Sequence, residues 1–179
     1  MTDGRFEAFL REYQDMVFAT AVRLLGSPSD AEDVAQTVFL KAFEHFDRIG
    51  ASPAAPGWLK TVTTNTCLSH LSRYRARWRF FSELDDVDAA GGFAEALWSN
   101  DINADAAIEQ ADEHARLERA LRSLPDHQRV PLVLFHFEQM SYQDIAALLQ
   151  VSIAKIKSDI HRGRERLKKT LAPETINGR

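Results

Sequence analysis

The chain has 179 residues, of which 22 are Lys or Arg and 26 are Asp or Glu, so the formal net charge is −4. An apolar share of 45% excludes wholesale disorder, and no apolar run approaches the roughly 18–20 residues of a membrane span. The single cysteine, Cys67, excludes an intrachain disulfide and a cysteine-based zinc site. The N-terminus lacks the pattern of a signal peptide, so we expect a soluble, cytoplasmic protein.

The charge is distributed unevenly along the chain. Residues 81–114 contain ten acidic residues and no Lys or Arg, whereas residues 115–179 contain twelve basic and seven acidic residues. Residues 1–80 are nearly neutral, with ten basic and nine acidic residues. Two near-neutral or basic blocks separated by an acidic segment indicate nucleic-acid contact beside an acidic linker.

Apolar residues that recur every three or four positions predict three N-terminal helices, over residues 5–25, 30–47 and 58–79. The second helix begins with capping-box spacing, in which Ser29 is the N-cap and Glu32 reaches back to it. Residues 48–57 contain two prolines and two glycines, which predict a loop. The third helix has five basic residues and no acid from position 60 onward, so it is a candidate nucleic-acid face.

The C-terminal block is also helical in pattern. Periodicity predicts a helix over 105–123, a restart at Leu-Pro-Asp with Pro131 near the first turn of the next helix, and two shorter helices. The fold class is therefore all-α, with two small helical domains joined by an acidic flexible linker. The expected boundaries are a first domain at 1–80, the linker at 81–104, a helix-turn-helix domain at 105–172 and a tail at 173–179.

Residues 141–171 have the pattern of a helix-turn-helix. Ser141 and Ser152 are placed to cap helices at 142–149 and 153–171. The second helix has an apolar stripe, which we expect to anchor it through Ile153, Ile156 and Ile160. Its other face is basic, and major-groove docking needs such a helix. A solvated basic face is the alternative. The candidate contacts are Ser152, Lys155, Lys157, His161, Arg162 and Arg164.

Asp159 interrupts this basic face one turn after Lys155. A carboxylate at that position would repel phosphates. It either pairs with Lys155 or Arg162, or accepts a hydrogen bond from a cytosine amino group. The sequence leaves these alternatives open.

Three ordered segments resemble the extracytoplasmic-function sigma factors of bacterial RNA polymerase. The segment Ser29–Phe43 resembles the family's core-polymerase-binding helix, and Trp58–Leu68 resembles its −10-element segment, including the Trp-Leu pair and the asparagine seven positions after the tryptophan. The segment Leu124–Leu167 resembles its −35-binding helix-turn-helix. The resemblance implies a promoter-specificity subunit whose partners are core RNA polymerase, promoter DNA and an anti-sigma factor.

The resemblance also implies which N-terminal residues act. Core polymerase would bind the polar face of the second helix, at Asp33, Gln36, Leu40 and Lys41. The −10 element would be bound by Trp58, Lys60, Asn65, Arg73, Arg75 and Arg77. The amide of Asn65 offers donors and an acceptor to an unstacked base, although a surface or packing role is the alternative. Leu40 has the same alternative, as a stray exposed leucine.

The chain departs from the family pattern at several positions. Polar or acidic residues stand where basic or charged residues are frequent, at Thr61, Thr64, Ser69, Ser72 and Asp159, and Gln150 stands where a turn glycine is frequent. These departures leave the architecture intact and affect the individual DNA contacts. They are consistent with an unusual promoter preference.

Two other function classes explain less of the chain. A stand-alone helix-turn-helix regulator accounts for 141–169 and leaves the two N-terminal segments unexplained. A nucleic-acid enzyme is not expected, because the chain has no phosphate-binding Gly-Lys-Ser/Thr loop and its six histidines show no metal-ligand spacing. Cys67 reads as a buried small residue rather than a nucleophile. We expect no cofactor and no metal.

Overall fold

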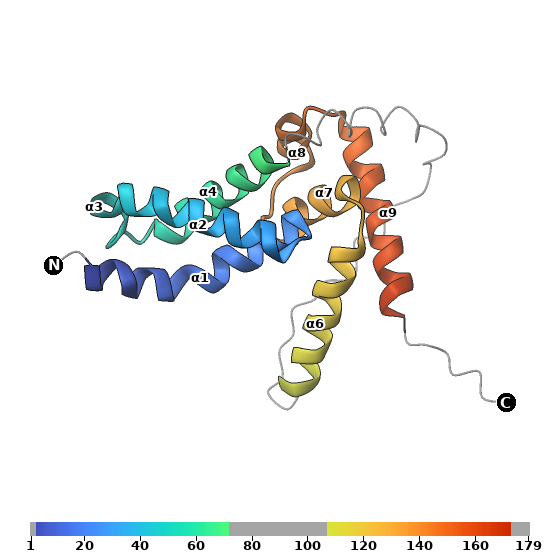
Figure 1. Cartoon of the computed structure of the whole chain (residues 1–179). Helices are drawn as coiled ribbons and strands as arrows, with labels where there is room; N and C mark the ends of the chain where they lie inside the picture. Colours follow the sequence, from blue (N-terminus) through green and yellow to red (C-terminus); the bar gives the residue numbers. More distant parts are fainter. Residues whose placement is uncertain (1–2, 72–106, 173–179) are drawn as a thin grey trace.

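The computed structural model describes residues 3–71 and 107–172, and within these ranges the chain is helical and has no strand. The all-α prediction is therefore confirmed (Figure 1). The expected linker, the C-terminal tail and three of the candidate arginines, at 73, 75 and 77, lie outside the described residues. The boundaries expected between 80 and 105 also fall there and stay predictions.

The N-terminal group consists of α1 (Asp3–Leu25), α2 (Pro28–Glu44), the short α3 (Phe46–Ile49) and α4 (Ala55–His70). The helices α1, α2 and α4 pack against one another in pairs. Their shared core includes the fully buried Val17, Leu24, Val38 and Leu59. Apolar stripes at helical spacing thus account for the packing of this group.

The start and end of α2 differ from the prediction. Ser27, rather than Ser29, is the N-cap, and its hydroxyl accepts a hydrogen bond from the Asp30 amide at 3.3 Å. Gly26 has φ +69 and ends α1, so the cap follows directly and Pro28 occupies the first turn. The helix ends at Glu44 because the backbone leaves helical geometry at His45.

The helix α4 begins three residues earlier than predicted, with Pro56 in its first turn. The loop before it is correspondingly shorter, because α3 occupies the start of the expected loop at 48–57. Threonine has a low helix propensity. In α4, threonine hydroxyls form hydrogen bonds within the helix itself. Thr63 and Thr66 each donate to the backbone oxygen four residues earlier, at 2.7 Å. Thr63 is thereby buried without an unpaired hydroxyl.

The C-terminal group consists of α6 (Ala107–Ser123), α7 (Asp126–His136), α8 (Tyr142–Leu149) and α9 (Ile153–Leu171). Pro131, predicted near the first turn of α7, is the sixth residue of the helix and lies in its second turn. The helices α7 and α9 cross closely at Gly163, where an added Cβ would lie 2.9 Å from Leu132 Cδ1. Glycine lets the two helices approach here without displacing the end of the Leu132 side chain.

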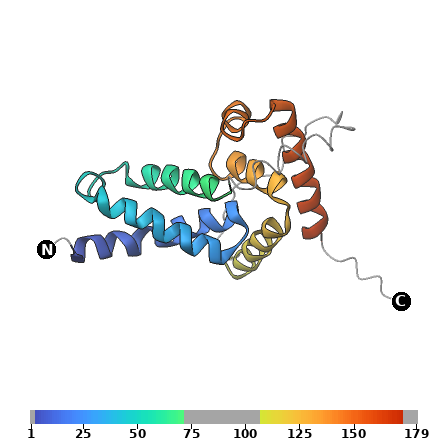
Figure 2. The same ribbon diagram turned by 45° about the horizontal axis from the view of Figure 1, so that its top comes forward.

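A buried arginine joins the two groups. Arg129 of α7 donates to the backbone oxygens of Leu25 at 2.9 Å and Leu124 at 2.7 Å, and its side chain is only 4% exposed. Gly26 makes room for it, because an added Cβ there would lie 2.6 Å from the guanidinium carbon. We call this contact between the end of α1 and the α6–α7 pair the interdomain seam (Figure 2).

A second ion pair lies at the same seam. Arg23 of α1 pairs with Glu118 of α6 at 2.6 Å, and both side chains are mostly buried. The Arg23 guanidinium also lies over the Phe137 ring, 4.5 Å from its centroid. The last turn of α1 is therefore held in two ways: Arg129 donates to its terminal carbonyls, and Arg23 ties it to α6.

Candidate nucleic-acid and polymerase-binding surfaces

The helix-turn-helix forms where the sequence predicts it, with α8 at 142–149 and α9 at 153–171. Ser141 accepts from the Asp144 amide at 3.1 Å, and Ser152 accepts from the Lys155 amide at 3.1 Å. Gln150 ends α8 in the left-handed conformation, with φ 58 and ψ 44. Glycine adopts this conformation more readily. Gln150 in place of the frequent glycine therefore makes the turn energetically less favourable but leaves its backbone conformation unchanged.

The apolar side of the motif is mostly as predicted. Ile145, Ala146 and Leu149 of α8 are buried, and so are Ile156 and Ile160 of α9. The expectation that Ile153 anchors α9 is wrong, since its side chain is 40% exposed. Ile153 is the first residue of α9, and the buried stripe continues along positions 156, 160, 163 and 167 instead.

The cations on the basic side of α9 differ in their exposure to solvent. Lys157 is exposed, with its ammonium 5.8 Å from the Tyr142 ring centroid. His161 and Arg162 are partly buried. Ser152, the N-cap, is exposed at the start of the helix. Ser152 and Lys157 are therefore exposed, and the other four predicted contacts, Lys155, His161, Arg162 and Arg164, are partly buried. Lys157 is the most accessible cation in the first turns of α9.

Arg164 is held by α7. Its guanidinium donates to His136 Nε2 at 3.1 Å and lies over the Phe135 ring, 5.6 Å from the centroid. Burial, followed by the charge of Arg164, lowers the pKa of His136 to about 4. His136 is therefore neutral near pH 7 and accepts the hydrogen bond. The structure thus makes His136 the support of a predicted DNA-binding arginine.

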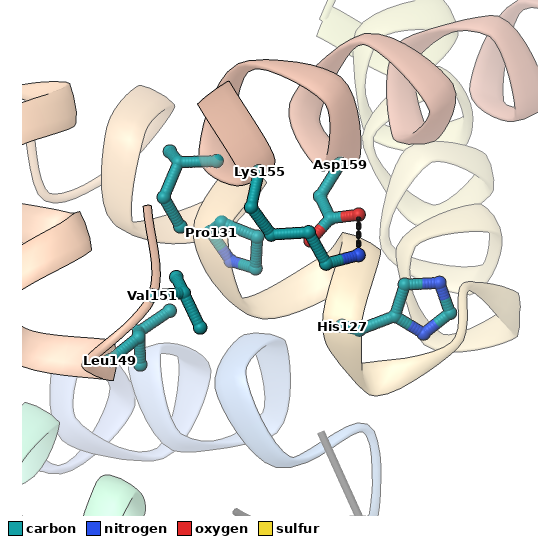
Figure 3. A pocket seen from close by; sticks show the side chains of 7 residues that line it. His127, Pro131, Leu149, Val151, Lys155 and Asp159 are labelled. Carbon is teal, nitrogen blue, oxygen red and sulfur yellow. Dashed lines mark hydrogen bonds and ion pairs between the residues drawn. The ribbon is translucent and has the colours of Figure 1, made fainter. Parts of the chain in front are cut away.

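Lys155 lies apart from this basic face. Its ammonium pairs with Asp159 Oδ1 at 2.8 Å, and the side chains are 12% and 5% exposed, respectively. The expected pairing of Asp159 with Lys155 is thus observed. Figure 3 shows both side chains in a small pocket beneath α9. The structure thus places Lys155 away from the open cations with which it was grouped.

The predicted −10 residues of α4 lie on two different sides of the helix. Trp58 and Asn65 are seven residues apart, about two helical turns, so they share one face. Asn65 is exposed, and the partly buried Trp58 ring lies 5.9 Å from the His45 ring, edge to face. Lys60 is half exposed and lies 4.0 Å from Glu138 Oε2, across from the C-terminal group. Three of the six predicted −10 residues are thus located.

The predicted polymerase-binding residues lie together on the exposed face of α2. Asp33, Gln36, Leu40 and Lys41 are all exposed, and Leu40 is 67% exposed. Phe43, which sequence reasoning did not select, is exposed on the same face, and its ring edge contacts Phe6. Its position three residues after Leu40 was the available signal. We call these five residues, Asp33, Gln36, Leu40, Lys41 and Phe43, the α2 outer face.

Other chemistry is not supported within the described ranges. Cys67 is fully buried, and burial is the main cause that raises its pKa to about 12, so it packs as predicted and is not poised as a thiolate. Residues 3–71 and 107–172 contain no cluster of His, Cys, Asp and Glu able to hold a metal ion. No helix within them is long and apolar enough to cross a membrane.

Comparison with known proteins identifies both helical groups. Residues 9–78 match the family described as Sigma-70 region 2, and residues 114–167 match Sigma-70, region 4. The RNA polymerase sigma-E factor of Streptomyces avermitilis is 32% identical over 174 residues, which cover 97% of this chain and 89% of that protein. The ECF RNA polymerase sigma factor SigE of Mycolicibacterium smegmatis is 33% identical over 93% of this chain, and the match spans 62% of that protein.

A solved structure is also similar. The sigma factor RpoE of Bartonella quintana, crystallised with the anti-sigma factor NepR, is 25% identical, with a TM-score of 0.49 over 94% of this chain and 98% of that chain.

Proposed function

Because the chain belongs to the extracytoplasmic-function sigma factors of bacterial RNA polymerase, we propose that it acts as a promoter-specificity subunit through three separate surfaces. The α2 outer face binds the core enzyme, α9 reads the −35 element as duplex, and α4 captures a −10 base after the strands open. The single observation that carries this proposal is the order of family matches, with region 2 over α1–α4 and region 4 over α6–α9.

The upstream contact is supported by the geometry of α9. The N-terminal residues of a recognition helix reach base edges, and the flanking cations contact phosphates. Ser152 and Lys157 are exposed at that end of α9, and Arg162 and Arg164 follow along the helix. The two serine caps fix the helix-turn-helix, so these side chains are presented by a rigid element.

The downstream contact is supported by α4. An amide side chain can pair with the Watson–Crick edge of an unstacked base. Asn65 is exposed on the outer side of α4, and Trp58 lies two turns earlier on the same face. Lys60, near the start of the helix, is placed to contact a phosphate once it leaves Glu138. Arg73, Arg75 and Arg77 continue this basic run beyond the described residues.

The core-polymerase contact is supported by the α2 outer face. Two large apolar side chains, Leu40 and Phe43, are exposed beside polar and charged groups. Exposed apolar side chains rimmed by polar residues are typical of protein–protein contacts. Anchoring both DNA-binding groups on one polymerase would raise their effective concentration at a promoter, so neither needs to bind DNA tightly alone.

The proposed mechanism requires the interdomain seam to open. Centres of elements named −10 and −35 are about 25 base pairs apart, roughly 85 Å at a rise of 3.4 Å per pair. The longest helix within residues 3–71 and 107–172, α1 with 23 residues, spans only about 35 Å. With Lys60 of α4 within 4.0 Å of Glu138, beside α8, the docked groups cannot reach both elements at once.

Further partners and the location of the protein follow from family membership. We propose an anti-sigma factor as a regulatory partner, the cytoplasm as the compartment, and no catalytic step carried out by this chain. Sigma factors are DNA-binding regulatory proteins, and the core enzyme performs the polymerisation.

Separate variants test whether α9 binds the upstream element and α4 the downstream element. Lys157→Met should weaken holoenzyme binding to a duplex carrying the upstream element and spare binding to a pre-melted downstream fork. Asn65→Ala should weaken binding to the pre-melted downstream fork and spare binding to the upstream duplex. Arg11→Gln, an exposed residue of α1, is the control for both. The assignment fails if Asn65→Ala and Lys157→Met affect the two templates equally, or if the chain binds a symmetric duplex tightly without polymerase.

A further inference from the structure

The pair formed by Lys155 and Asp159 is unusual in position. Both residues belong to α9, one turn apart, and their side chains enter a pocket lined by His127 and Pro131 of α7 and by Leu149 and Val151 before α9 (Figure 3). Lys155 is the third residue of the helix, where a cation would ordinarily reach DNA. Its ammonium instead lies 2.8 Å from the Asp159 carboxylate, inside the fold.

Burial makes this pair difficult to separate. The Asp159 side chain is 5% exposed, so withdrawing Lys155 would remove a cation that lies 2.8 Å from a buried carboxylate. Breaking a buried ion pair by removing one partner is strongly unfavourable. A DNA phosphate competing for Lys155 would also approach the Asp159 carboxylate, which repels it. The pair is therefore expected to stay closed when α9 enters the groove.

From this geometry we propose that Asp159 is a positioning residue, which holds Lys155 inside the motif and removes one cation from the upstream DNA contact. The inference rests on the proposed role of α9 in reading duplex DNA. It revises the candidate set, because Lys155 then positions the start of α9 against α7, and Lys157 is the first cation of α9 that contacts phosphate. The family frequently has arginine at position 159. An aspartate there lowers the positive charge of α9 in two ways, because it is itself negative and because it neutralises Lys155.

The salt dependence of binding counts phosphate contacts. Each lysine or arginine that neutralises a phosphate contributes about −0.9 to the slope of log affinity against log salt concentration. The slope would be measured for holoenzyme on a promoter fragment, so that contributions common to all variants cancel. Lys157→Met should flatten the slope by about 0.9, whereas Lys155→Met should leave it within about 0.3 of wild type. Asp159→Asn should steepen it by about 0.9, because Lys155 is then free to reach a phosphate.

A folding control keeps the experiment decisive. The double variant Lys155→Met/Asp159→Leu replaces the pair by apolar residues of similar size, which a buried site tolerates. It should melt near the wild-type temperature and keep the wild-type slope. If Asp159→Asn or Lys155→Met does not fold, the comparison of the double variant with Lys157→Met still decides, because only the double variant should keep the wild-type slope.

Two results would overturn the inference in different ways. Flattening by Lys155→Met as large as that by Lys157→Met would show that Lys155 contacts DNA, and would refute this inference alone. Absence of any upstream-element binding by wild-type holoenzyme would refute the proposed duplex role of α9, and the inference with it.

Discussion

Arg129→Met tests the interdomain seam. Methionine keeps an unbranched apolar side chain in the same space and removes every donor of the guanidinium. In the wild-type chain that guanidinium bonds the backbone oxygens of Leu25 and Leu124 and pairs with Asp126. The substitution leaves the last carbonyls of α1 without their cationic partner.

The magnitude follows from the burial and the bonds. A hydrogen bond to a charged group contributes about 1.5–3 kcal/mol, so the two short bonds to carbonyls contribute about 3–6 kcal/mol before desolvation. Methionine avoids the cost of burying a charge, which offsets part of that loss. We expect the free energy of unfolding to fall by about 2–4 kcal/mol. Of the two short bonds, the one to Leu25 crosses the seam, so about half of the loss should be lost coupling between the groups.

Two measurements separate stability from coupling. Urea denaturation followed by circular dichroism gives the free energy of unfolding, and hydrogen exchange reports opening of individual helices. Arg129→Met should speed exchange in the last turn of α1 as well as in α7. The control is Arg166→Met, an exposed arginine of α9, which should change stability by less than about 0.5 kcal/mol.

Two results would contradict the expected role of Arg129. Faster exchange in α7 with unchanged exchange in α1 would refute the seam as a solution contact. Wild-type stability in Arg129→Met would refute the energetic argument from burial.

Three further predictions concern single sites. The pKa of His136 is lowered to about 4 from an ordinary 6.5, so its contribution to stability is complete above pH 6.5 and is lost as pH falls towards 4. The free energy of unfolding should fall by less than about 1.4 kcal/mol per pH unit in that range. His136→Asn should flatten the dependence of the melting temperature on pH, and an unchanged dependence would count against the assignment. Gln150→Gly should raise stability by about 0.5–1 kcal/mol, since φ is 58; a lower melting temperature would contradict this. Leu40→Ser should weaken core-polymerase binding about 10-fold in a competition assay, with an unaltered melting temperature; full affinity would remove Leu40 from the interface.

Local signals made the C-terminal motif predictable. Ser141 and Ser152 bond amides three residues ahead of them, and such caps can be read from a few neighbouring residues, so α8 and α9 begin and end where expected. The start of α2 was less determined, because Ser27 and Ser29 are both good caps. In the folded chain Gly26 ends α1 and Pro28 begins α2, so Ser27 between them is the N-cap.

Periodicity alone misplaced two side chains of α9. Ile153 falls on the apolar stripe in sequence, but at the first position of the helix little of the core lies beneath it. Lys155 falls on the basic stripe, but a long flexible side chain can bend towards a carboxylate one turn away. Sequence spacing specifies the direction of a Cβ atom and not the destination of an ammonium group.

The interdomain seam had no local signature. Arg129 reads as one polar residue at the start of an apolar helix, and its partner carbonyls lie 104 and 105 residues earlier. The exposed Phe43 was missed for a related reason, since an aromatic residue beside a core stripe is ordinarily assigned to the core. Long-range packing decides both cases.

Run-off transcription with purified bacterial core polymerase on a promoter library tests the central claim most directly. The chain should confer initiation on a subset of templates that share an upstream and a downstream element, whereas core polymerase alone should not initiate at them. Failure to confer promoter-specific initiation with any compatible core polymerase would contradict the account.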